Sequence, residues 1–179
     1  MDIALITTTI YVPEVLRAYR HAGPDVLIII AGDLKSPHLA IEELVKGIDA
    51  LYLLPADQER WACSEAIGWN SIRRRNIAIL EALARGADVI VTVDDDNLPL
   101  GDYFTDLETA MTRKTWLTKI AWDSPLDGPI LDYGAMWDPP YIQRGSPRNA
   151  ARDYRVEICG PAEVGLLQGV ILGEPDRAA

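Results

Sequence analysis

The sequence predicts a single α/β domain of three layers, in which helices cover both faces of a mostly parallel sheet. Short runs that are apolar throughout alternate with helix-like segments over the first half of the chain. Strands of this kind are buried on both faces, as in parallel sheets. The 179 residues suit one domain, and no linker or internal repeat divides them.

The first half contains four apolar runs that are expected to be strands. They are residues 3–6, 26–31, 50–54 and 89–93. Polar residues follow these runs: Thr7, Thr8 and Thr9 after the first, and Asp33 after the second. In an open parallel sheet the carboxyl ends of the strands share one edge, where ligands bind. We therefore expect these side chains to meet there, in position to bind a base and a ribose, although such residues also cap ordinary loops.

Helices are expected between and after these strands, at residues 13–21, 39–46, 71–85 and 103–111. The helix at 71–85 is the best defined, because Ser71 suits its N-cap and Gly86 suits the position after its end. Its buried face is expected to carry Ile72, Ile79 and Leu83.

The second half has a different pattern. A strand is expected at 116–122 and another at 165–172, and residues 123–155 between them are rich in proline, glycine and aromatic residues. A loop region of this length inside a domain is usually functional.

Composition narrows the class of partner. A formal charge of −10 argues against nucleic acid or an anionic membrane as the main partner. It is compatible with a nucleotide, because a divalent cation masks acidic groups locally. The apolar runs are too short to span a bilayer, and no basic segment precedes the first strand, so a cytoplasmic location is expected.

The acidic run Asp94, Asp95 and Asp96, with Asn97 behind it, comes directly after a buried strand. Adjacent carboxylates repel one another, and a hard divalent cation with oxygen ligands compensates for this well. If the backbone stays extended, Asp94 and Asp96 point to one side and Asp95 to the other. The run then predicts an Mn²⁺ or Mg²⁺ site at Asp94 and Asp96. The alternative is an Asp-rich turn before Pro99.

Three arginines, Arg73, Arg74 and Arg75, open the helix at 71–85, followed by Asn76. Cations oppose the dipole at a helix N-terminus, but free N–H groups and guanidinium groups together bind phosphate well. We therefore expect Arg74, Arg75 and Asn76 to bind a diphosphate from the side opposite the metal. The alternative is a solvated basic face, balanced by Glu65 and Glu81.

Several catalytic classes lack their signatures. No G-x-G-x-x-G follows the first strand and no G-x-x-x-x-G-K-[ST] is present, which argues against a dinucleotide-binding enzyme and a P-loop NTPase. The two histidines, His21 and His38, lie beside turn residues and are expected at the surface.

Three segments resemble the GT-A class of nucleotide-diphospho-sugar transferases, and within it the reversibly glycosylated polypeptide, UDP-arabinopyranose mutase and STELLO-like group. Residues 91–97 (VTVDDDN) are similar to the strand and acidic motif of the group, and residues 168–176 (QGVILGEPD) to the segment that closes its core. Residues 144–147 (RGSP) resemble its Arg-Gly-aromatic-Pro motif, with Ser146 in place of the aromatic. Members of the group continue further, so a small acceptor-binding portion is expected.

The resemblance implies one GT-A-like, Rossmann-like domain, with a nucleotide-binding half at 1–100 and a sugar and acceptor half at 101–179. Asp94 and Asp96 would hold the metal, with Asp95 beside the diphosphate, and Asp33 and the threonines would contact the nucleoside. Arg144 matches the position at which mutase-like members carry an arginine that can become glycosylated.

The expected function is metal-dependent transfer of a glycosyl group from a nucleoside diphosphate sugar, a UDP-sugar first, to an unknown acceptor. An inverting reaction also needs a carboxylate base, and Asp132 and Asp138 are the first candidates because they flank Trp137, whose ring could stack on a sugar. Two alternatives remain: a mutase that acts on the nucleotide sugar through Arg144, and a silent binding module that needs a partner subunit. Self-association into a homo-oligomer is also compatible with a short chain.

Overall fold

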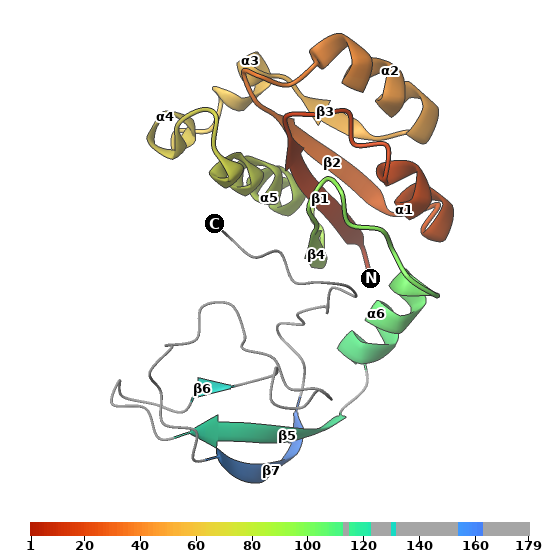
Figure 1. The fold of residues 1–179 in the computed structure, drawn as a ribbon, viewed down its shortest axis with the longest axis vertical. Coiled ribbons are helices and arrows are strands. Elements are labelled where there is room, and N and C mark those ends of the chain that lie inside the picture. Colours follow the sequence, from red (N-terminus) through yellow and green to blue (C-terminus); the bar gives the residue numbers. More distant parts are fainter. Residues whose placement is uncertain (113–114, 123–129, 132–153, 163–179) are drawn as a thin grey trace. The chain divides into compact units, whose positions relative to one another are not determined.

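The computed structural model describes residues 1–112, 115–122, 130–131 and 154–162, and beyond residue 112 it describes the backbone of three strands (Figure 1). The chain divides into two compact units between Phe104 and Thr105. Among the described residues, no helix is long and apolar enough to cross a membrane.

The first unit is built on a four-stranded, all-parallel sheet, which confirms the predicted α/β class. Its strands, in the order in which they lie side by side, are β3 (Leu51–Leu53), β2 (Leu27–Gly32), β1 (Ile3–Thr9) and β4 (Val89–Thr92). β1 is thus central, paired with β2 from Ala4 to Thr9 and with β4 from Ile3 to Ile6.

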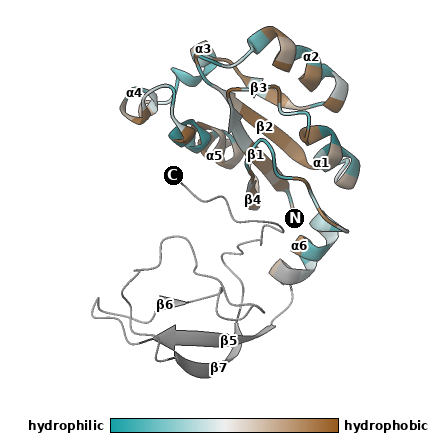
Figure 2. Cartoon of the chain, in the orientation of Figure 1, coloured by the Kyte–Doolittle hydropathy of each residue, from teal (hydrophilic) through white to brown (hydrophobic). Residues whose placement is uncertain are grey.

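Helices connect these strands. They are α1 (Leu16–Ala22), α2 (His38–Ile48), α3 (Pro55–Gln58), α4 (Ser64–Ile67), the 3₁₀ turn η1 (Ile72–Arg74) and α5 (Arg75–Ala84), with α6 (Tyr103–Thr112) after the sheet. Alternate residues of a strand face opposite sides of the sheet, and both sets are buried here: Ile6 and Ile29 pack with α5, while Leu5 and Ile28 are fully buried on the other side. Residues on both faces of the central strands are therefore buried, and Figure 2 shows hydrophobic residues gathered there.

The buried face of α5 differs from the expected one. Ile77, Ala78 and Ala82 pack against the sheet and Ile79 is partly buried against the same core, whereas Ile72 and Leu83 are 67% and 57% exposed. Ile72 belongs to the 3₁₀ turn η1, with about three residues per turn, and Ile79 and Leu83 belong to α5, with about 3.6. Ile72 therefore does not share a face with them as it would in one continuous α-helix. The predicted ends are confirmed, because the Ser71 hydroxyl accepts the Arg73 N–H and Gly86 has a φ of 82°.

Glu81 is also on the buried face of α5 and is 2% exposed. It pairs with Arg85, at 2.7 Å, and with Arg60. A buried carboxylate requires such partners. Glu81 therefore balances these two arginines and not the three that open the helix.

The second unit contains an antiparallel sheet of β6 (Ile130–Leu131), β5 (Thr115–Trp122) and β7 (Tyr154–Ala162), in that order. β5 agrees with the expected strand at 116–122. β6 and β7 were not predicted, and β6 and the first two residues of β7 fall in the segment expected to be a loop. The expected strand at 165–172 lies outside the described residues.

Candidate functional site

The order of the strands creates a ligand-binding position. From β1 the chain proceeds to β2 and β3 on one side, and β4 then lies on the other side of β1. Connections that leave neighbouring strands in opposite directions open a crevice beyond their carboxyl ends, which is where open α/β sheets bind ligands. In this chain, Thr9 ends β1 and the acidic run follows β4, so both lie at the edge of the sheet where such a crevice is expected.

The acidic run forms a turn. The Asn97 N–H donates to the Asp94 carbonyl at 3.4 Å, with Asp95 and Asp96 at the centre of the turn. The backbone is therefore not extended there, and the alternative of an Asp-rich turn describes it correctly. Within this turn, Asp94 and Asp96 are exposed and Asp95 is partly buried.

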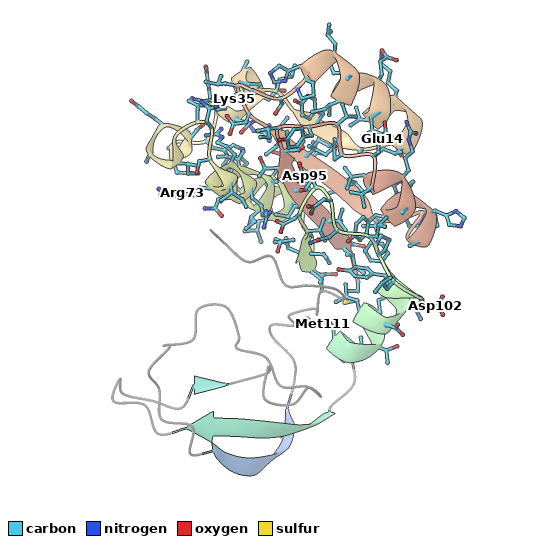
Figure 3. All side chains as sticks on the ribbon, viewed as in Figure 1. Glu14, Lys35, Arg73, Asp95, Asp102 and Met111 are labelled. Atoms are coloured by element: carbon cyan, nitrogen blue, oxygen red, sulfur yellow. The ribbon has the colours of Figure 1, made fainter. Side chains whose placement is uncertain are left out.

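Asp95 is turned towards the end of β1 (Figure 3). The Thr9 hydroxyl, 3% exposed, accepts the Tyr11 N–H at 2.9 Å and lies within hydrogen-bonding distance of Asp95 Oδ2. The hydroxyl has one proton to donate, and both the Asp95 carboxylate and the Tyr11 carbonyl, at 2.9 Å, are within reach as acceptors. The charged carboxylate is the stronger acceptor, which favours the bond from Thr9 to Asp95. This bond joins the carboxyl ends of β1 and β4.

Asp94 pairs with the first residue of α5. An Arg75 guanidinium nitrogen forms an ion pair with Asp94 Oδ1; the side chains of Arg75 and Asp94 are 21% and 51% exposed. Arg75 Nε is buried without a hydrogen-bond partner in the described part of the chain. Arg75 therefore contacts the acidic run directly, whereas the sequence analysis placed it across a diphosphate from the metal ligands.

Arg74 has a different position from its neighbour. It is completely buried, donates to the Gln58 side chain and to the Ser64 carbonyl at 2.9 Å, and lies 3.8 Å from the centroid of the Trp69 ring. Burial lowers the pKa of its guanidinium. These contacts hold the segment between α3 and α5 in place. The guanidinium is thus used inside the protein and is not presented to a diphosphate, contrary to the expectation for Arg74.

The residues on either side of Arg74 and Arg75, namely Arg73 and Asn76, are at the surface. Arg73 is exposed (Figure 3), and so is Asn76, whose side chain has no hydrogen bond to any described residue. Of the three arginines, the structure places only Arg75 against the acidic run.

Asp33, at the end of β2, is 2% exposed and bonds to backbone groups. Its carboxylate accepts the N–H groups of Leu34 and Asn70, both at 2.7 Å, and of Ser71 at 3.0 Å. Asp33 therefore fixes the start of η1 to the end of β2. Both carboxylate oxygens of Asp33 already accept backbone hydrogen bonds. A nucleoside that contacts Asp33 would therefore use the same oxygens in addition to these bonds.

The three threonines are also in different environments. Thr7 is fully buried, and the Thr8 hydroxyl donates to the Ala31 carbonyl at 2.8 Å across to β2. Thr9 alone among them bonds to the acidic run.

Sequence reasoning missed several residues that shape this edge. The Ser36 hydroxyl donates to the Thr9 carbonyl at 2.5 Å and accepts the Asp33 N–H at 2.7 Å, which ties β1 to the loop after β2. The Tyr52 hydroxyl bonds His38 Nδ1 at 2.7 Å, and burial raises the pKa of Tyr52 to about 12. His38 is therefore partly buried and paired, whereas a surface position was expected.

The expected residues of the second half, Asp132, Asp138, Trp137 and Arg144, lie outside the described residues. Among the residues whose side chains the structure describes, which all precede residue 113, no group of three or more His, Cys, Asp or Glu side chains converges on a metal position. Compared with known protein families and with curated proteins, the chain matches none of them.

Proposed function

We propose that the chain binds a nucleoside diphosphate sugar, a UDP-sugar first, through Mn²⁺ or Mg²⁺ at the carboxyl edge of its parallel sheet, and transfers the glycosyl group as a GT-A-like enzyme. The observation that carries the proposal is the meeting of three segments at one crevice. Thr9 bonds Asp95 and Arg75 pairs with Asp94, so the ends of β1 and β4 and the start of α5 converge where α/β sheets bind ligands.

The donor set fits a hard cation. Asp94 and Asp96 supply carboxylate oxygens from one turn, and both are exposed. Mg²⁺ is typically held by one or two protein carboxylates together with water and substrate phosphate oxygens. The lack of a third described acidic ligand is consistent with such a site, because the diphosphate would supply the remaining oxygens.

The metal would neutralise charge that develops on the departing diphosphate. Arg75 would help to neutralise the same charge, since α5 holds its guanidinium next to the acidic run. Preorganised charges of this kind commonly make the largest contribution to such a reaction. Asp95, fixed by Thr9, would keep the turn in place beneath the ligand.

The remaining roles rest on the resemblance. Asp132 or Asp138 would act as the base that activates the acceptor, and Arg144 and Trp137 would contact the sugar. A non-catalytic sugar-nucleotide-binding module is the second candidate. It is favoured by the fact that Thr9, Arg75 and the acidic run all belong to the unit Met1–Phe104.

The proposal is tested by incubating the protein with a panel of UDP-, GDP- and dTDP-sugars and Mn²⁺, and by measuring binding and products together. Release of nucleoside diphosphate would support transfer or hydrolysis, and a rearranged sugar would indicate a mutase. Metal-dependent binding without turnover would indicate the module. If no sugar nucleotide binds with or without metal, the proposal is wrong.

A further inference from the structure

Arg75 occupies the carboxylate that the proposed metal site requires. Its guanidinium pairs with Asp94, whereas the Asp96 side chain makes no hydrogen bond or ion pair with any described residue. We propose that Arg75 is an internal counter-ion that leaves Asp94 for the diphosphate when the metal binds, so that metal and nucleotide bind cooperatively. This inference rests on the proposed function.

The pair is suited to exchange. Asp94 is 51% exposed, and ion pairs in contact with solvent are worth only about 0–1 kcal/mol. Arg75 also keeps a buried Nε without a partner in the described part of the chain, so its hydrogen-bonding capacity is only partly used. A diphosphate offers two or more oxygens to a planar guanidinium and would satisfy it better than one carboxylate oxygen.

Charge makes each ligand a poor binder alone. In the acidic run itself, the carboxylates of Asp94, Asp95 and Asp96 outweigh the guanidinium of Arg75, so the run repels a diphosphate that arrives without metal. A metal that arrives alone must displace Arg75 from Asp94 and leave that guanidinium beside another cation. When both ligands bind, the metal takes the carboxylates and Arg75 takes the diphosphate.

The consequence is a reciprocal coupling between the two ligands. Arg75→Gln should affect the binding of Mn²⁺ alone and its coupling to UDP in opposite ways, which the simple loss of one binding group does not predict. Without the competing guanidinium, Asp94 is available, so Mn²⁺ alone should bind more tightly than to the wild-type protein. At the same time, Mn²⁺ should improve UDP affinity less, because the released guanidinium is missing.

The test is calorimetric titration with Mn²⁺ alone, UDP alone and UDP at saturating Mn²⁺, for the wild type, Arg75→Gln, Arg75→Lys and Arg73→Gln. Binding of Mn²⁺ can be followed independently from the electron paramagnetic resonance signal of free Mn²⁺. In the wild type, we expect Mn²⁺ to raise UDP affinity by about tenfold or more. In Arg75→Gln, Mn²⁺ alone should bind about two- to fivefold more tightly, and the coupling should fall below about threefold.

Arg75→Lys keeps the charge and should retain wild-type Mn²⁺ affinity, and Arg73→Gln removes an exposed arginine two residues away and should behave as the wild type. If Arg75→Gln binds Mn²⁺ no more tightly than the wild type, or keeps the full coupling, the exchange is wrong although the proposed function stands. If the wild type itself binds neither Mn²⁺ nor UDP, the proposed function is wrong and the inference is overturned with it.

Discussion

The ends of β2 and β4 both carry aspartates, but they use them in opposite ways. Asp33, after β2, is buried and accepts backbone N–H groups from two segments of the chain. The three aspartates after β4, Asp94, Asp95 and Asp96, are exposed or partly buried. Asp94 pairs with the Arg75 side chain, and Asp95 bonds the Thr9 side chain. Backbone partners cannot move without changing the fold, whereas an exposed side chain can turn to a ligand.

The same contrast separates two adjacent arginines. Arg74 is enclosed by Gln58, Ser64 and Trp69, while Arg75 pairs with an exposed carboxylate. Adjacent residues of a helical turn point in directions about 100° apart, so one faces the interior and the next faces the crevice. The polar residues of this edge therefore fall into two groups. Asp33 and Arg74 form a structural group, which is buried and bonded within the protein, and Asp94, Asp96 and Arg75 form an exchangeable group, which can turn to a ligand.

The largest loss of stability is expected for Asp33→Ala. The substitution removes the acceptor of three backbone N–H groups and should lower the free energy of unfolding by about 3 kcal/mol, since bonds to charged groups are worth about 1.5–3 kcal/mol each and are not additive. Urea denaturation followed by circular dichroism measures this. Asp25→Ala, at an exposed aspartate, is the control and should stay within about 0.5 kcal/mol of the wild type. If Asp33→Ala costs no more than the control, its carboxylate is free for a ligand and the division between the two strand ends fails.

The next largest effect is expected for Arg74→Met. It leaves the Gln58 side-chain oxygen and the Ser64 carbonyl short of donors in a buried place, with an expected loss of about 2 kcal/mol. Arg73→Met is the matched control at an exposed position and should be nearly neutral. Equal losses in the two variants would contradict the structural role of Arg74.

The sequence predicted the strands well because an apolar run flanked by turn residues is a local signal. It did not predict the buried face of α5, since the 3₁₀ turn at η1 changes the phase between Ile72 and the residues that follow. It also missed β7, where Gly160 and Pro161 argue against a strand and pairing with β5 is a long-range effect.

For the site, the sequence indicated the edge but not the partners. The carboxyl ends of β1 and β4 were expected at one edge, and their adjacency follows from a strand order that local patterns do not encode. The bond between Thr9 and Asp95 and the bonds of Asp33 to Asn70 and Ser71 join residues far apart in the chain. The role of Gln58 was missed because a glutamine in a charged segment has no feature that marks it as buried.

A smaller effect is expected for Thr9→Val, which tests the link between β1 and β4. The Tyr11 N–H and the Asp95 carboxylate each lose the hydroxyl, at a cost of about 1 kcal/mol. Thr92→Val, at an exposed threonine at the end of β4, should cost less than about 0.5 kcal/mol and serves as control. Thermal unfolding of both variants measures the difference. A Thr9→Val variant as stable as the control would show that the bond between Thr9 and Asp95 does not stabilise the protein.

The smallest effect on stability, and the most direct test of the exchangeable group, is expected for Asp96→Ala. The Asp96 side chain is exposed and bonds to no described residue, so the free energy of unfolding should stay within about 0.5 kcal/mol of the wild type. Calorimetric titration with UDP, with and without Mn²⁺, is the decisive measurement. We expect Mn²⁺ to raise the UDP affinity of the wild type but not that of the folded Asp96→Ala variant. Wild-type, metal-dependent affinity in that variant would contradict it and remove the acidic run from the site.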